Sequence, residues 1–114
     1  MKVNINNYNF IVGIPSSALK NIIADVPNHY YCTNESEAIG MAVGAYLAGK
    51  KPLVYMQDDG IGRIITDLAT LVIPYKIELF ILIGHRSKPE QHEILGRVVE
   101  TLLQTIGFTN YEIV

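Results

Sequence analysis

The strongest candidate for chemistry in this 114-residue chain is one acidic residue at the start of an otherwise apolar, small-residue segment. The segment runs from Asn34 to Lys50, and Glu35 is its second residue. Asn34 suits a helix N-cap, and Glu37 can reach back to the cap. The pattern therefore places Glu35 in a first helical turn, where the helix dipole favours a carboxylate. Spacing alone leaves two interpretations: a solvated partner of the dipole, or a carboxylate with a chemical role.

The same predicted helix has a side with little side-chain bulk. The small residues on it are Ala38, Ala42, Gly44 and Ala45. Small residues at helical spacing allow another backbone or a second subunit to approach closely. We therefore expect a contact face on the helix that carries Glu35.

Short β-rich runs alternate with helical periodicity along the whole chain, which predicts a three-layer α/β fold. In such a fold a doubly wound, mostly parallel sheet has helices on both faces. The expected strands are residues 9–13, 29–33, 53–57, 78–84 and 111–114, and the expected helices are residues 17–24, 35–48, 62–71 and 92–106. Gly49 and Gly107 stand where left-handed caps would end two helices. The prolines expected in connections are Pro15, Pro52, Pro74 and Pro89.

Polar and glycine residues collect where these strands are expected to end. They lie in residues 13–17, 34–35, 57–62 and 84–86. Ligands of open parallel sheets bind outside the carboxyl ends of the strands. The pattern therefore predicts one site at this edge of the sheet.

Four segments, in this order and spacing, resemble the pyrimidine-binding domain of thiamine diphosphate enzymes. More narrowly, the chain is similar to the alpha subunit of sulfopyruvate decarboxylases and to the N-terminal half of phosphonopyruvate decarboxylases. The segments are residues 12–20, the Glu35 helix, residues 55–57 with 60–62, and residues 82–86 with 89–92. Together they span nearly the whole chain.

The resemblance implies specific roles. Glu35 would be the catalytic residue, because the matching glutamate of the family hydrogen-bonds the aminopyrimidine ring of the cofactor and needs a dry carboxyl that can share a proton. The other implied cofactor-binding residues are Gly13, Pro15, Gln57, Gly60 and Gly62, and the implied substrate-binding residues are Ser17, Asp58, Asp59 and Arg86. Ser16 and Ser17 equally suit helix capping. His92 suits a helix start or, by resemblance, a family Gln-His pair.

The chain departs from the family pattern beside the third strand. Asp58 and Asp59 stand where the relatives tend to carry Asn-Ser, and Arg63 stands where they tend to carry Asn. Two like charges 4 Å apart repel by about 4 kcal/mol at an effective dielectric near 20, so these carboxylates would oppose an anionic substrate. Either Arg63 neutralises them or the substrate differs. A plain Asp-Gly turn and a two-aspartate metal site are further interpretations. The loop from Arg86 to Gln91 also looks shorter than in the phosphonopyruvate enzymes.

Composition narrows the class of protein. With 49% hydrophobic and 18% charged residues, the chain can form one domain over residues 1–114. A net charge of −2 and no basic stripe argue against nucleic-acid binding. The sequence has no apolar run of membrane-spanning length, so we expect a cytoplasmic protein. Cys32, the single cysteine, suits an apolar packing role better than a catalytic thiol.

The resemblance implies the pyrimidine-binding subunit of a thiamine diphosphate-dependent 2-oxo acid decarboxylase or carboligase. A separate diphosphate-binding (beta) subunit would hold the diphosphate and its Mg²⁺, in a hetero-oligomer with a homodimeric or heterodimeric interface at the Glu35 helix. Only a short strand is expected after Gly107, so the domain looks shortened at its C-terminus. One alternative is a noncatalytic paralogue that acts as a scaffold or regulatory partner. A weaker one is a stand-alone nucleotide-binding domain, because the sequence has no suitable Gly-rich loop after the first expected strand.

Overall fold

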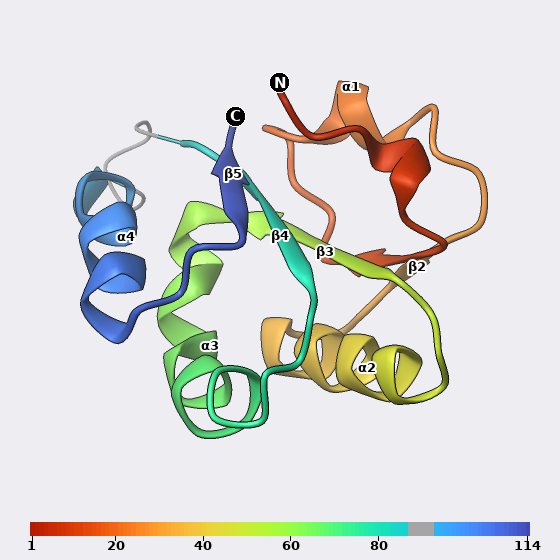
Figure 1. Ribbon diagram of the computed structural model, residues 1–114. Helices are drawn as coiled ribbons and strands as arrows, with labels where there is room; N and C mark the ends of the chain where they lie inside the picture. Colours follow the sequence, from red (N-terminus) through yellow and green to blue (C-terminus); the bar gives the residue numbers. More distant parts are fainter. Residues whose placement is uncertain (87–92) are drawn as a thin grey trace.

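The fold is built on a five-stranded parallel sheet in the order β2-β1-β3-β4-β5 (Figure 1). It is seen in a computed structural model that describes residues 1–86 and 93–114. The strands are β1 (Phe10–Gly13), β2 (His29–Tyr31), β3 (Pro52–Gln57), β4 (Phe80–Gly84) and β5 (Tyr111–Ile113). All five predicted strands are present, with ends that shift by up to two residues. The parallel α/β class predicted from the sequence is confirmed.

The helices connect successive strands. They are α1 (Lys20–Ile23), α2 (Glu35–Leu47), α3 (Ile61–Asp67) and α4 (Glu93–Ile106). A π-helical segment, η3 (Leu68–Val72), extends α3, and two 3₁₀ turns, η1 (Ile5–Asn7) and η2 (Asp58–Gly60), precede β1 and α3. The predicted helix start at His92 and the length of the Arg86–Gln91 loop concern residues 87–92, which lie outside the described residues.

Alternate residues of the central strands point to opposite faces of the sheet and form two cores. In β3, Val54 and Met56 join the larger core, whereas Leu53 and Tyr55 join the smaller one. Helices α2, α3 and α4 cover the larger core, while α1 and the N-terminal segment cover the other face (Figure 1). Helices on both faces confirm the predicted three-layer arrangement.

Glycine and proline mostly fall where the sequence placed them. Gly49 and Gly107 end α2 and α4 with φ of +88° and +83°, the left-handed conformation that glycine adopts without strain. Pro15 and Pro74 lie in connections as expected. The prediction for Pro52 is wrong, because Pro52 is the first residue of β3. A strand tolerates proline at its first position, where the missing N–H matters least.

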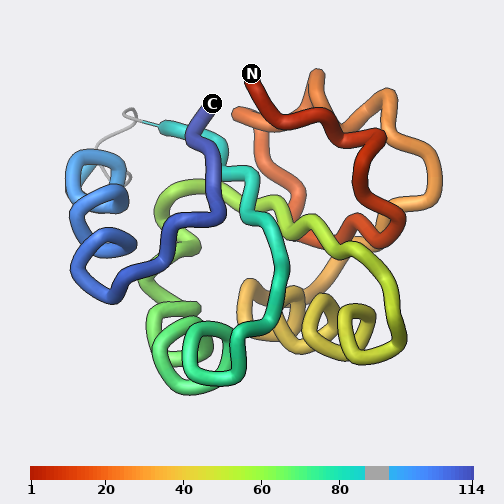
Figure 2. The backbone as a smooth tube through the Cα atoms, viewed as in Figure 1, coloured from red at the N-terminus to blue at the C-terminus, as the bar shows by residue number. Residues whose placement is uncertain are grey.

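The two ends of the described chain meet on the face of the sheet opposite α2 (Figure 2). The backbone N–H groups of Lys2 and Val3 each donate to the Glu112 carboxylate at 2.7 Å. Partial burial acts to raise the pKa of Glu112, but these two hydrogen bonds, together with the positive charges of the N-terminus and Lys2, lower the pKa below its ordinary value. The carboxylate therefore fastens the N-terminal segment to β5.

Replacing Glu112 by glutamine is expected to reduce the free energy of unfolding by about 1 kcal/mol at pH 7, because a charged acceptor is lost. A carboxyl whose pKa is lowered by folding contributes stability above its unfolded pKa, and that stability is lost as the pH falls through the folded pKa. In urea unfolding curves, the difference between the two proteins should therefore be much smaller at a pH well below the ordinary pKa of a glutamate than at pH 7. The exposed Glu78→Gln variant is the control. An equal difference at both pH values would contradict this role of Glu112.

Candidate functional site

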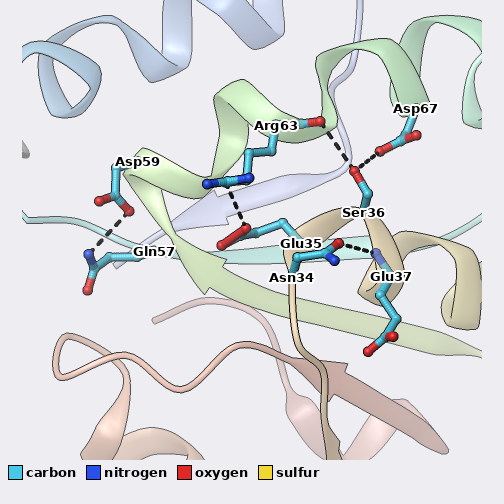
Figure 3. Close-up of polar contacts among 8 residues, drawn as sticks. All are labelled: Asn34, Glu35, Ser36, Glu37, Gln57, Asp59, Arg63 and Asp67. Atoms are coloured by element: carbon cyan, nitrogen blue, oxygen red, sulfur yellow. Dashed lines mark hydrogen bonds and ion pairs between the residues drawn. The ribbon is translucent and has the colours of Figure 1, made fainter.

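A modified capping box holds the start of α2. The Asn34 side chain accepts a hydrogen bond from the Glu37 backbone N–H at 2.9 Å, as the sequence predicted (Figure 3). The Glu37 carboxylate accepts from the backbone N–H of Thr33 at 2.9 Å, one residue before the cap itself. Glu35 is thereby fixed as the first residue of the helix.

The Glu35 side chain is largely buried, with 16% exposed. It lies against Gly60, where an added Cβ would come within 2.8 Å of Glu35 Cγ. Arg63 closes the other side, with Nε 3.5 Å from Glu35 Oε1, and its own side chain is 72% exposed (Figure 3). The alternative in which Arg63 neutralises Asp58 or Asp59 does not hold in this structure. Arg63 therefore forms its ion pair with Glu35.

Helices α2 and α3 are fastened together beside Glu35. The Ser36 hydroxyl donates to Asp67 Oδ2 at 2.7 Å and lies 3.4 Å from the Arg63 carbonyl oxygen (Figure 3). This contact fixes the first turn of α2 relative to the helix that carries Arg63. The geometry around Glu35 therefore depends on two helices and on the glycine that ends η2.

Gln57, at the end of β3, joins the loop after β1 to η2. Its Oε1 accepts from the Ser16 hydroxyl at 2.8 Å, and its Nε2 donates to Asp59 Oδ1 at 3.2 Å. Ser16 Oγ also accepts from the Ala18 backbone N–H at 3.2 Å, which makes a local turn. The predicted capping by serine is wrong, because the N-cap of α1 is Leu19, which makes no side-chain cap bond.

Arg86 and Ser17 meet although 69 positions separate them in the sequence. Arg86 Nη1 donates to Ser17 Oγ at 2.8 Å. The two residues follow β4 and β1, so the contact spans the carboxyl edge of the sheet above β3. The structure thus brings together two of the residues that the sequence assigned to one site.

Asp58, which was predicted to contact substrate, is fully buried in this structure. Its Oδ2 accepts from the Arg86 backbone N–H at 2.8 Å and lies 3.0 Å from Nδ1 of His85. The carboxylate therefore organises the turn after β4. Sequence reasoning treated His85 only as part of a basic loop. The available signal was an aspartate and a histidine directly after two apolar strands.

The structure gives a packing reason for some of the glycines predicted to bind the cofactor, but not for others. A Cβ at Gly13 would collide with the Tyr55 carbonyl oxygen and come within 2.6 Å of the Tyr55 ring, so strand pairing requires glycine there. A Cβ at the exposed Gly62 would meet only Leu95 Cδ1, at an ordinary 3.9 Å. Pro15 is exposed in the β1–α1 connection. Packing therefore explains Gly13 without a ligand, whereas it gives no reason for Gly62.

Cys32 is partly buried, with Sγ 3.4 Å from the Met41 sulfur. Burial, assisted by the charge of Glu37, raises the pKa of this thiol. A thiol with a raised pKa is a poor nucleophile, which favours the packing role of Cys32.

The two-aspartate metal site considered from the sequence gains no support from the structure. Within residues 1–86 and 93–114, no three histidine, cysteine or acidic side chains are grouped to hold a metal ion.

One surface hollow of about 860 Å³ lies away from these residues. It is lined by the N-terminal segment, the start of β4, strand β5 and the C-terminal part of α4. A cavity of about 80 Å³, lined in part by Pro15, Ser16 and Tyr55, lies beside the carboxyl edge. Ligand pockets usually measure about 300–1,000 Å³, so this small cavity is at most part of one.

The fold is an α/β domain, and its convergent polar residues place the candidate ligand site at the carboxyl edge of the parallel sheet. No protein-family model matches the chain. The sulfopyruvate decarboxylase subunit alpha of Methanocaldococcus jannaschii is 34% identical over 116 residues, which cover 94% of this chain and 69% of that subunit. The corresponding subunit of Methanococcus maripaludis is 33% identical, over 85% of this chain and 64% of that subunit.

The chain belongs to the family of sulfopyruvate decarboxylase alpha subunits. This confirms the resemblance drawn from the four sequence segments. The chain spans about two thirds of the length of these subunits. The phosphonopyruvate decarboxylase of Streptomyces viridochromogenes is 30% identical over 82% of this chain, but the match covers only 26% of that longer enzyme. In the described part of the chain, no helix is both long and apolar enough to cross a membrane.

Proposed function

We propose that this chain is the pyrimidine-binding (alpha) subunit of a thiamine diphosphate-dependent decarboxylase of 2-oxo acids, of the sulfopyruvate or phosphonopyruvate type. The observation that carries the proposal is the placement of Glu35. The Glu35 side chain is only 16% exposed. It projects from the first turn of α2 and lies against Gly60, in the segment after β3. The names of the family members support decarboxylation as the reaction.

The donor and acceptor groups of this chain fit the pyrimidine half of the cofactor. The Glu35 carboxyl can share a proton with a ring nitrogen, and Gly60 leaves room for that side chain against the backbone. Gln57 adds an amide at the same edge. When bound, thiamine diphosphate supplies a nucleophilic carbon that adds to the 2-oxo group and accepts the electron pair released with CO₂. The role of the chain is to hold the ring and keep the proton-sharing carboxyl away from water.

Arg86 is the candidate anchor for the anionic substrate. A planar guanidinium can hold a carboxylate, sulfonate or phosphonate through two hydrogen bonds. Its bond to Ser17 orients the guanidinium along the carboxyl edge of the sheet. The carboxylate of Asp58 is buried and paired with His85, and that of Asp59 lies within hydrogen-bond distance of Gln57.

A second subunit is part of the proposal. The family members are named as alpha subunits, and these names support a partner subunit. We expect that beta subunit to hold the diphosphate and Mg²⁺. The exposed side of α2 suits the interface, because Gly40, Met41, Gly44 and Leu47 on it are small or apolar. Of the alanines expected on the contact face, Ala38 and Ala42 pack in the larger core and Ala45 is buried. A cytoplasmic location stays a prediction.

The test is to coexpress this chain with a candidate diphosphate-binding subunit and purify the complex. Thiamine diphosphate retention and decarboxylation of pyruvate, sulfopyruvate and phosphonopyruvate are then measured. We expect a complex that retains the cofactor and decarboxylates at least one of these acids, whereas neither separate subunit does. A stable complex that retains no cofactor would contradict the proposal.

The noncatalytic paralogue remains a second candidate because Arg63 already pairs with Glu35. A cation at this carboxyl competes with an aminopyrimidine for the same oxygen. An exposed ion pair contributes about 0.2–1 kcal/mol, which corresponds to a small factor in affinity. A scaffold subunit would tolerate such an arrangement without consequence, whereas a cofactor-binding subunit must displace or accommodate Arg63.

Arg63→Gln in the assembled complex is therefore expected to tighten thiamine diphosphate binding by about twofold to fivefold. Isothermal titration calorimetry against the wild-type complex measures the change. Arg97→Gln, which removes an exposed arginine from α4, is the matched control. Weaker binding in Arg63→Gln would show instead that the guanidinium helps to hold the cofactor.

A further inference from the structure

A buried aspartate and a half-exposed histidine form a pair that the cofactor-binding role of Glu35 does not use. Asp58 is fully buried, and its Oδ2 lies 3.0 Å from His85 Nδ1. Its other oxygen, Oδ1, is also buried and receives no hydrogen bond from the described residues. The His85 side chain is 44% exposed. A carboxylate kept from water thus has an imidazole as its one side-chain partner in the described part of the chain.

The pair fixes which nitrogen of His85 is available for chemistry. A carboxylate accepts, so His85 Nδ1 carries the donated hydrogen and Nε2 is left to exchange a proton. A buried carboxylate that orients a histidine in this way is a recurring arrangement for acid–base catalysis.

The location of His85 connects the pair to the site. His85 follows β4 and precedes Arg86, whose guanidinium bonds Ser17. Gly96 of α4 packs over the pair, since a Cβ there would lie 3.1 Å from Asp58 Oδ2 and 3.4 Å from His85 Cε1. The imidazole is therefore held between η2 and α4, next to the proposed anchor of the substrate anion.

We propose that His85 delivers the proton that decarboxylation consumes, and that Asp58 is its positioning residue; this rests on the proposed function. Loss of CO₂ from a 2-oxo acid breaks a C–C bond and leaves an electron pair on the former carbonyl carbon. A proton must add to that carbon to give the aldehyde. The imidazolium of His85 gives this proton from Nε2, becomes neutral, and is reprotonated by water.

The first test is a spectroscopic one on the chain without substrate. Nitrogen-15 NMR of the imidazole rings reports which ring nitrogen carries hydrogen in the neutral form. We expect the signal assigned to His85, by its loss in His85→Gln, to be the Nδ1–H tautomer. An Nε2–H tautomer would overturn the arrangement, because Nδ1 could not then donate to Asp58.

The second test uses the complex with the diphosphate-binding subunit. His85→Gln is expected to lower kcat by about 100-fold with KM changed less than about twofold, because a proton donor is lost. Added imidazole should restore at least a tenth of wild-type kcat in His85→Ala. Asp58→Asn keeps the acceptor oxygen but removes the charge, so a smaller loss of about tenfold is expected. The control is His29→Gln, a histidine outside the site whose Nδ1 also bonds a neighbour, the Val26 carbonyl oxygen.

The outcomes separate this inference from the function on which it rests. An inactive wild-type complex contradicts the proposed function. An active wild-type complex with full kcat in His85→Gln overturns the role of His85 alone. A loss of activity in His85→Ala that imidazole does not restore would also overturn proton delivery and leave Asp58 and His85 as anchors of the turn after β4.

Discussion

Replacing Glu35 by glutamine is expected to lower the decarboxylation rate of the assembled complex by about a thousandfold. Proton transfer by a positioned side chain contributes about 10²–10⁴-fold, and a neutral amide cannot share a proton with the pyrimidine ring. The amide has nearly the same shape, so the contact with Gly60 is preserved. The ion pair with the largely exposed Arg63 side chain contributes at most about 1 kcal/mol, so folding and assembly should be unchanged.

Steady-state kinetics of the purified complex measures this loss, with size-exclusion chromatography to check assembly. Glu37→Gln is the matched control, since it changes another glutamate in the first turn of α2, whose carboxylate accepts from the Thr33 backbone N–H. That variant should keep wild-type kcat. Normal turnover in Glu35→Gln would remove the chemical basis of the proposed enzyme and favour the noncatalytic paralogue.

Replacing Gly13 by alanine is expected to cost about 3 kcal/mol or more of folding stability. The added methyl group would enter the space of the Tyr55 carbonyl oxygen, and the backbone atoms of two paired strands cannot move apart cheaply. The same change at Gly62 meets open space near Leu95 and replaces glycine within α3. It should stabilise the protein by about 0.5–1 kcal/mol through helix propensity.

Urea unfolding of the two alanine variants and the wild type measures both effects. Comparing the two variants also separates packing from ligand binding, because the family resemblance implies that both glycines bind the cofactor. If Gly62→Ala keeps the stability but loses thiamine diphosphate binding, a close approach of the cofactor explains that glycine. Wild-type stability in Gly13→Ala would contradict the tight strand pairing seen here.

Most of the fold could be predicted because local signals agreed with the tertiary structure. The helix after Asn34 was expected at residues 35–48 and is found at Glu35–Leu47, since a polar cap and Gly49 mark both ends. The helix expected from Ser17 is shorter, Lys20–Ile23, because Ser16 uses its hydroxyl for a turn and a bond to Gln57. Propensity alone cannot reveal such a tertiary competitor.

The site was predicted in location but not in its pairings. The parallel topology brought Ser17 and Arg86 together, because both follow strands of the same sheet. The partner of Arg63 could not be read from the sequence, since Glu35 lies on a different helix and three carboxylates stood within reach of the expected site. Burial of Asp58 depends on how α4 packs over η2, which hydrophobic patterning does not report.

The most direct measurement is a crystal structure of the complex between this chain and its diphosphate-binding subunit with thiamine diphosphate bound. We predict that a Glu35 carboxyl oxygen lies about 2.5–2.8 Å from a pyrimidine ring nitrogen, at a charge-assisted hydrogen-bond distance, with Arg63 turned aside. A cofactor bound elsewhere, with Glu35 still paired to Arg63 and open to water in the assembled complex, would contradict the proposed role of this subunit.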